Sequence, residues 1–201
     1  MIEERDRGKE RKRKKEEKNM RKQAGYEYLL TYKATTVIYD LTVQFCRRWV
    51  NPRSRTNDQM VQAARSGRQN IAEGYKQQSL KSYIRLCGVA RGSQEELLKD
   101  YEDYARQNCI TVWPKNKAKV MREIRKIWEE VRKDCPYHPS RPYPLPRKKE
   151  QAVNLLLTLI NQTNYLLDKQ IASLERKFIE EGGYTESLFK KRMERRRRRE
   201  E

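Results

Sequence analysis

Four long segments of the chain place apolar residues at steps of three and four, and few helix-breaking residues interrupt them. The first of these stripes consists of Leu30, Ala34, Val37, Leu41, Phe45 and Trp49. Such spacing puts one apolar face along an α-helix. Glycine and proline number only 8 and 7 among 201 residues, which also favours helices. The sequence therefore predicts an all-α protein, an up-and-down antiparallel four-helix bundle whose long helices bury their stripes together.

The second stripe is made mostly of small residues, so this helix should approach its neighbours closely. Its inward positions are Met60, Ala63, Ala64, Gly67 and Ile71. Thr56 and Gln59 have the spacing of a capping box at its start. Gly74 suits the left-handed residue that follows a helix end.

The third helix is expected to start after Ser79, which can cap it. Its stripe runs from Tyr83 to Tyr104. Gly88 and Gly92 lie inside it and weaken a helix by up to about 1 kcal/mol each relative to alanine. Two glycines four residues apart predict that another backbone lies close to this helix.

An insertion separates the third long helix from the fourth. Trp113 and Pro114 are expected to begin a short amphipathic helix, because proline suits the first helical position. Its expected stripe is Ala118, Met121, Ile124, Trp128 and Val131. A proline-rich connector at 135–146 cannot be helical. The fourth stripe follows between Val153 and Phe178, and Gly182-Gly183 is expected to end that helix.

These boundaries divide the chain into five parts. They are a basic N-terminal arm (1–22), three long helices (23–110), an inserted helix with its proline-rich connector (111–146), a fourth long helix (147–183) and a basic C-terminal tail (184–201), expected to be a solvated arm.

The charge of the chain predicts an acidic partner. The formal net charge is +19, of which residues 1–22 and 187–201 carry +5 each, leaving +9 on the residues between them. A basic central part indicates a surface for phosphates, with nucleic acid favoured over an acidic protein. No segment has the apolar core of a signal peptide or the length of a membrane span, so a cytoplasmic protein is expected. The cysteines have no metal-site spacing and are expected to be free thiols; they are Cys46, Cys87, Cys109 and Cys135.

The sequence shows no set of residues typical of catalysis. The one histidine, His138, lies in the proline-rich connector, and with Cys135 it would give only two of the ligands that zinc needs. Neither a P-loop nor a dinucleotide-binding glycine motif is present. Glu95 and Glu96 are adjacent, so their side chains diverge on a helix. We expect a non-enzymatic protein without cofactor or metal.

Basic residues cluster near the turn after the first helix and along the second helix. Tyrosine, with 12 copies, could add stacking surfaces. No helix-turn-helix, zinc-finger or RNA-recognition motif is present, so the sequence favours contacts to phosphates without base-specific readout. The candidate nucleic-acid-binding residues are Arg47, Arg48, Arg53, Arg55, Arg65 and Arg68.

The stretch from residue 57 to residue 104 resembles the bacterial four-helix-bundle family of 23S rRNA intervening-sequence proteins. The whole chain, which also has the insertion and the last helix, is similar to a subgroup with a four-helix-bundle suffix domain. The motif that carries the resemblance is "NIAEG" followed by "GSQEEL". Its residues, which should be structural, are Asn70, Ile71, Ala72, Glu73, Gly74, Gly92, Ser93 and Glu96.

The resemblance implies an up-and-down bundle that assembles as a homo-oligomer, with a pentamer suspected. A distant similarity to the accessory variability protein of retroelements implies binding to a reverse transcriptase and to nucleic acid. The chain departs from the family pattern at Gln62, at Gly67-Arg68 and at Gln77-Gln78, where the family has arginine, an apolar residue with proline, and a basic pair. If those family arginines bind a partner, Arg65 and Arg68 are the candidates to replace them.

Three functions therefore stay open, of which the simplest is a toxin-like or mobile-element accessory protein with no ligand beyond itself. Another is a basic accessory protein that binds the backbone of RNA or DNA, with a partner enzyme such as a reverse transcriptase. The third is a protein-interaction scaffold of a mobile element or rRNA insertion, without a direct nucleic-acid role.

Overall fold

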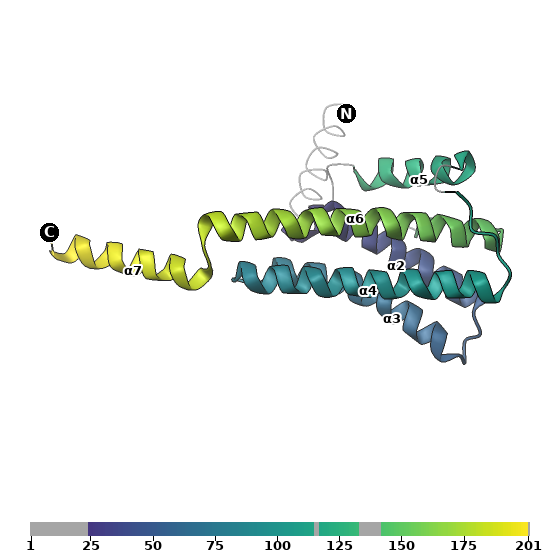
Figure 1. Cartoon of the computed structure of the whole chain (residues 1–201), viewed down its shortest axis with the longest axis horizontal. Coiled ribbons are helices and arrows are strands. Elements are labelled where there is room, and N and C mark those ends of the chain that lie inside the picture. Colours follow the sequence, from purple (N-terminus) through teal and green to yellow (C-terminus); the bar gives the residue numbers. More distant parts are fainter. Residues whose placement is uncertain (1–23, 115–116, 133–141, 201) are drawn as a thin grey trace, which may run out of the picture.

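The computed structural model describes residues 24–114, 117–132 and 142–200, and every regular element in them is a helix (Figure 1). The expected all-α class is thereby confirmed. The elements are η1 (Gly25–Tyr28), α2 (Leu30–Trp49), α3 (Arg55–Tyr75), α4 (Leu80–Gln107), α5 (Ala118–Val131), α6 (Lys149–Glu181) and α7 (Tyr184–Glu200).

Four helices, α2, α3, α4 and α6, form what we call the helical body. α3 packs on α2 and α4, and α6 packs on the same two helices (Figure 1). The core contains large, fully buried side chains from the body and from α5, among them Phe45, Tyr101, Ile127 and Leu156. The apolar stripes read for the four long helices are therefore the surfaces that meet in this core.

The start of α3 differs from the expected capping box. Ser54 is the N-cap, and its hydroxyl accepts a hydrogen bond of 3.2 Å from the backbone N–H of Asn57. Thr56 lies inside the first turn, so the prediction that it caps with Gln59 is wrong. Ser79 does occupy the N-cap position of α4, but its side chain makes no capping hydrogen bond.

Three glycines, Gly74, Gly88 and Gly92, lie in surroundings opposite to those predicted. α3 continues through Gly74 to Tyr75, so Gly74 is not a left-handed cap. It is buried, and a Cβ atom there would lie 2.8 Å from the ring of Tyr83 on α4. Gly88 and Gly92 were expected to face a close backbone, yet they are exposed and a Cβ on either would meet no atom within 4 Å.

α5 begins at Ala118, so the prediction that Pro114 is its first residue is wrong. The buried residues are Val120, Ile124 and Ile127, whereas Ala118 is exposed. The expected stripe was therefore rotated relative to the face that packs on α6. Trp128 sits at its edge, partly buried against the same core.

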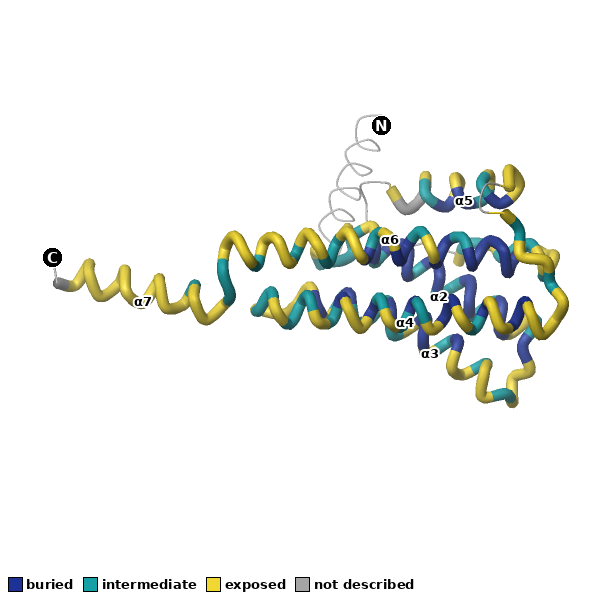
Figure 2. The backbone as a smooth tube through the Cα atoms, in the orientation of Figure 1, coloured by how far each residue is buried: buried dark blue, intermediate teal, exposed yellow. Residues whose placement is uncertain are grey.

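The end of α6 agrees with the sequence, because Gly182 adopts a φ of 79°, a left-handed value that favours glycine. Beyond it, α7 projects from the body and its described residues are mostly exposed (Figure 2). The tail is thus exposed as expected, and it is also helical. No helix of the described residues is long and apolar enough to cross a membrane.

Candidate nucleic-acid interface

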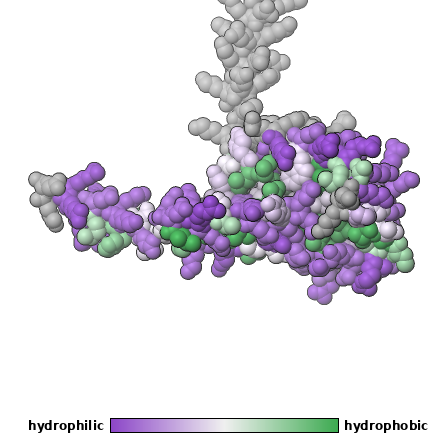
Figure 3. All heavy atoms as spheres, turned by 45° about the horizontal axis from the view of Figure 1, so that its top comes forward, coloured by the Kyte–Doolittle hydropathy of each residue, from purple (hydrophilic) through white to green (hydrophobic). Residues whose placement is uncertain are grey.

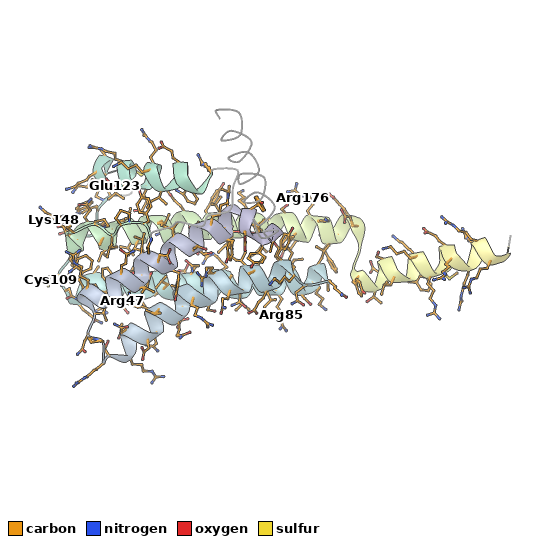
Figure 4. All side chains as sticks on the ribbon, turned by 180° about the vertical axis from the view of Figure 1, so that it is seen from behind. Arg47, Arg85, Cys109, Glu123, Lys148 and Arg176 are labelled. Atoms are coloured by element: carbon orange, nitrogen blue, oxygen red, sulfur yellow. The ribbon has the colours of Figure 1, made fainter. Side chains whose placement is uncertain are left out.

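One end of the helical body collects basic residues from segments far apart in the sequence. Arg47 and Lys148 lie at this end together with Cys109 (Figure 4). The end of α2, the start of α3 and the start of α6 lie at this end of the body, and the start of α3 stands apart from α6 (Figure 1). We call this group the basic end; its members are Arg47, Arg48, Arg53, Arg55, Arg147, Lys148 and Lys149.

Aromatic packing connects the two halves of the basic end. The Arg48 guanidinium lies 4.9 Å from the centre of the Trp49 ring, and Lys149 Nζ lies 5.8 Å from the centre of the Tyr104 ring. The Tyr104 hydroxyl donates a 3.0 Å hydrogen bond to the Trp49 carbonyl. Both rings also pack edge-on against Phe45, so the cations rest on a rigid part of the core.

The charges of the basic end are available to a ligand. None of its seven residues forms an ion pair with another of the described residues. Two nearby carboxylates, Glu102 and Asp103, pair with Lys99 and Arg106 at 2.8 Å each. Glu102 and Asp103 are therefore paired within their own helix.

The other two predicted arginines lie elsewhere. Arg65 is exposed ten residues after Arg55, which is about 15 Å along a helix. Arg68 is half-buried, with its guanidinium 4.5 Å from the centre of the Tyr39 ring. Burial raises the pKa of Asp40, and the charge of Arg68 opposes that rise. Arg68 thus serves the contact between α3 and α2, whereas Arg65 faces solvent.

The motif of the resemblance lies along the contact between α3 and α4. The Asn70 amide donates to the Ser66 carbonyl at 2.9 Å, and the Ser66 and Ser93 hydroxyls share a 2.9 Å hydrogen bond across the two helices. Ile71 is fully buried, as expected for a structural residue. Glu96 is exposed.

Two further motif residues line a cavity of about 240 Å³ beside η1. They are Ala72 and Glu73, and Arg68 and Lys76 share the lining. A structural role for Glu73 would give its carboxylate a backbone group or a cation of a neighbouring helix as partner, for example Arg91 on α4. Arg91 instead pairs with Glu95 at 2.8 Å and with Asp168 at 3.1 Å.

The three described cysteines are free thiols, as expected. Burial raises the pKa of Cys46 to about 12 and that of Cys87 to about 11, so both thiols are protonated and unreactive at neutral pH. Cys109 is exposed. Cys135 and His138 lie outside the described residues, among which no three His, Cys, Asp or Glu side chains converge as metal ligands.

A sequence model of the 23S rRNA-intervening sequence protein matches residues 28–132, more than half of the chain. The chain belongs to this family. The match confirms the resemblance read from the motif at 70–74 and 92–97. It spans α2 to α5 and ends before α6, so the helix that completes the core of this family member lies outside the matched region. No curated protein and no solved structure matches the chain.

Sequence reasoning missed three residues of the basic end, Arg147, Lys148 and Lys149. They follow the proline-rich connector and are about one hundred residues from Arg47 and Arg48. The run of three cations was visible in the sequence. Its position at the same end of the body as the α2–α3 turn depends on the end at which α6 starts.

Proposed function

We propose that this protein is a cytoplasmic, non-enzymatic accessory protein that binds the phosphate backbone of RNA or DNA through its basic end. The scaffold of this site is an up-and-down four-helix bundle of α2, α3, α4 and α6. The observation that carries the proposal is the convergence of seven cations, unpaired among the described residues, on one end of a packed body. Such a surface suits phosphates, whose neutralisation releases counterions and gives salt-dependent binding.

A charge-reversal experiment with a matched control tests the proposal. The test variant combines Arg53→Glu, Arg55→Glu and Lys148→Glu at the basic end. The control combines Lys81→Glu, Arg85→Glu and Arg176→Glu; Arg85 and Arg176 lie away from the basic end (Figure 4). Both variants change the net charge equally, so a difference between them reports position and not overall charge.

Binding is measured by fluorescence anisotropy with a structured RNA and a DNA duplex between 50 and 200 mM salt. The slope of log K against log salt is negative, and if all three cations contact phosphates, its magnitude should be smaller by about 2 to 3 in the test variant. The control variant should bind with nearly the wild-type slope. Equal losses in both variants would remove the basic end from the proposal, and an absence of wild-type binding at 50 mM salt would overturn the function itself.

We further propose that the protein acts as a homo-oligomer, with the pentamer implied by the resemblance. Gly88 and Gly92 support this, because they leave open space on α4 beside Val89, which is 46% exposed. A second helix could approach closely there. Light scattering should give the mass of at least two chains of 24.3 kDa each, and of five chains for the pentamer. A monomer at micromolar concentration would contradict the proposal.

A protein scaffold without a nucleic-acid role is the second candidate. The exposed apolar residues of α7 favour it: Phe189 is 64% exposed, and Leu188 and Met193 are 47% and 40% exposed. Figure 3 shows pale hydrophobic atoms on this mainly hydrophilic helix. The double variant Leu188→Ser with Phe189→Ser should abolish capture of a protein partner, such as a reverse transcriptase, if α7 is its docking helix. Unchanged capture would contradict that role.

A further inference from the structure

A cavity of about 510 Å³ lies where the end of α5 crosses the middle of α6, beside the start of α2. Its volume is within the range of about 300 to 1,000 Å³ that is typical of small-ligand pockets. Trp128 and Tyr165 supply aromatic rings, and Leu30 adds an apolar wall. Asn161, Gln162 and Arg132 supply polar groups.

The aromatic rings offer a stacking surface. Tyr165 is 60% exposed, so much of its ring is open to a ligand. Lys169 Nζ lies over one face of that ring, 5.3 Å from its centre, so a base would stack on the other face. Trp128 is half-buried and held in place by a 2.5 Å hydrogen bond from its ring N–H to Gln162 Oε1.

The two amides at the cavity retain unused hydrogen-bonding groups. Because Gln162 Oε1 accepts from Trp128, its Nε2 is left as a donor without an acceptor among the described residues. The Asn161 amide nitrogen donates to the Leu157 carbonyl at 2.8 Å, which leaves Asn161 Oδ1 as a free acceptor in the described part of the chain. A hydrogen-bond acceptor, Asn161 Oδ1, and a donor, Gln162 Nε2, therefore belong to adjacent residues that line a pocket with aromatic rings.

A nucleobase uses this combination of groups. Unstacked bases bind proteins by stacking on aromatic rings while their edges form hydrogen bonds with amide side chains. Arg132 is exposed and forms no ion pair among the described residues, so it is available to the phosphate of the same nucleotide. A lipid or an apolar peptide would leave the two amides and the two cations without partners.

We propose that this cavity binds one unstacked nucleobase of a single-stranded segment, with Tyr165 as the stacking residue, Asn161 and Gln162 at the base edge, and Arg132 at the phosphate. This inference rests on the proposed nucleic-acid function and adds the class of nucleic acid. Residues 161–165 lie at least 12 residues beyond Lys149 on α6, or about 18 Å along the helix. The pocket and the basic end are therefore separate contacts of one ligand.

The experiment compares wild type with Tyr165→Ala and with Tyr165→Phe, which keeps the ring. Tyr184→Ala is the control, since Tyr184 is also exposed but lies on α7. Anisotropy is measured with a labelled 12-nucleotide single strand and with the duplex of the same sequence. Circular dichroism checks that each variant is folded, which is expected for a surface ring.

Tyr165→Ala should weaken single-strand binding about tenfold or more, the range found for loss of one stacked base. Tyr165→Phe and Tyr184→Ala should bind the single strand like wild type, and all variants should bind the duplex equally. A parallel titration with nucleoside monophosphates, followed by tryptophan fluorescence, identifies the source of the base. Binding of the monophosphate that is lost in Tyr165→Ala, with strand binding unchanged, would assign the pocket to a free nucleotide.

The outcomes separate this inference from the function on which it rests. Wild-type binding of both ligands with no selective effect of Tyr165→Ala, and no monophosphate binding, would overturn the pocket and leave the basic end intact. An absence of binding to strand and duplex alike would overturn the proposed function, and with it the strand as ligand of this pocket.

Discussion

The contact between α3 and α4 and the contact between α5 and α6 are built from different kinds of residue. α3 meets α4 through glycine, alanine and serine, with Gly67 and Gly74 against the side chains of Gln94 and Tyr83. α5 meets α6 through long side chains, with Ile124 and Ile127 fully or almost fully buried. The distance between packed helices depends on the side chains at their contact. The small residues therefore let α3 and α4 pack closely together. The larger residues hold α5 on the body at the contact with α6, and a cavity remains beside Trp128.

Removing volume from the α5–α6 contact should have the largest effect. Ile127→Ala deletes a fully buried side chain and should lower the free energy of unfolding by about 2 to 5 kcal/mol. Urea unfolding followed by circular dichroism measures it. Lys126→Ala, at the exposed neighbouring position, is the control and should change little. A loss below 1 kcal/mol in Ile127→Ala would show that α5 does not depend on this contact.

Adding volume to the α3–α4 contact should also destabilise the protein. Gly74→Ala gains up to about 1 kcal/mol of helix propensity. Its Cβ would stand 2.8 Å from the Tyr83 ring and 3.2 Å from Leu86 Cβ, so repacking should cost about 1 to 3 kcal/mol. With a gain of about 1 kcal/mol subtracted, the expected net loss is about 0 to 2 kcal/mol in the same urea experiment. A stabilised variant would mean that the two helices can separate without cost.

The same contact contains a polar group that should weaken it. Gln94 is fully buried, and neither its Nε2 nor its Oε1 has a hydrogen-bond partner in the described structure. Gln94→Met keeps a similar shape without the unpaired groups and should stabilise the protein by about 1 to 2 kcal/mol. Thermal unfolding at fixed concentration measures the change. Destabilisation would indicate that Gln94 finds partners in solution, and that the contact depends on them.

The two exposed glycines of α4 should respond in the opposite direction to Gly74. In the monomer, Gly88→Ala and Gly92→Ala should each stabilise the helix by about 0.5 to 1 kcal/mol, because the added methyl meets no atom of the same chain within 4 Å. In the proposed homo-oligomer, the same methyl groups should weaken association, which light scattering on the variants measures. Stabilisation with an unchanged oligomer mass would place the subunit interface away from these glycines.

The helix stripes could be predicted because apolar periodicity depends on local sequence alone. Leu41, Phe45 and Tyr101 were all expected in stripes and are fully buried. The cap of α3 could not be decided in the same way, because Ser54 and Thr56 both carry a hydroxyl ahead of an apolar helix. The role of Gly74 depends on Tyr83, which lies nine residues later on another helix. From the sequence alone, a glycine at this position fits a turn as well as a close contact between two helices.

The candidate site was only half visible in the sequence. Arg47, Arg48, Arg53 and Arg55 lie within nine residues of one another and stood out as a cluster. The Arg147–Lys149 run joins them only through the path of the chain across α5 and the connector. The 510 Å³ cavity was invisible for a related reason, since α2, α5 and α6 each contribute to its lining and the expected α5 stripe was rotated.

Cys109, just after the C-terminal end of α4, is a site at the basic end where a probe can be attached. The Ile110 N–H donates to the Ala105 carbonyl at 2.8 Å and the Cys109 N–H to the Arg106 carbonyl at 3.3 Å, the bonds of a Schellman motif with Cys109 in the left-handed position, at φ 53°. Its thiol is exposed, whereas Cys46 and Cys87 are buried. In a Cys135→Ser background, a maleimide dye on Cys109 would therefore report directly on what approaches this end, and spin labels there would measure distances between the subunits of an assembly.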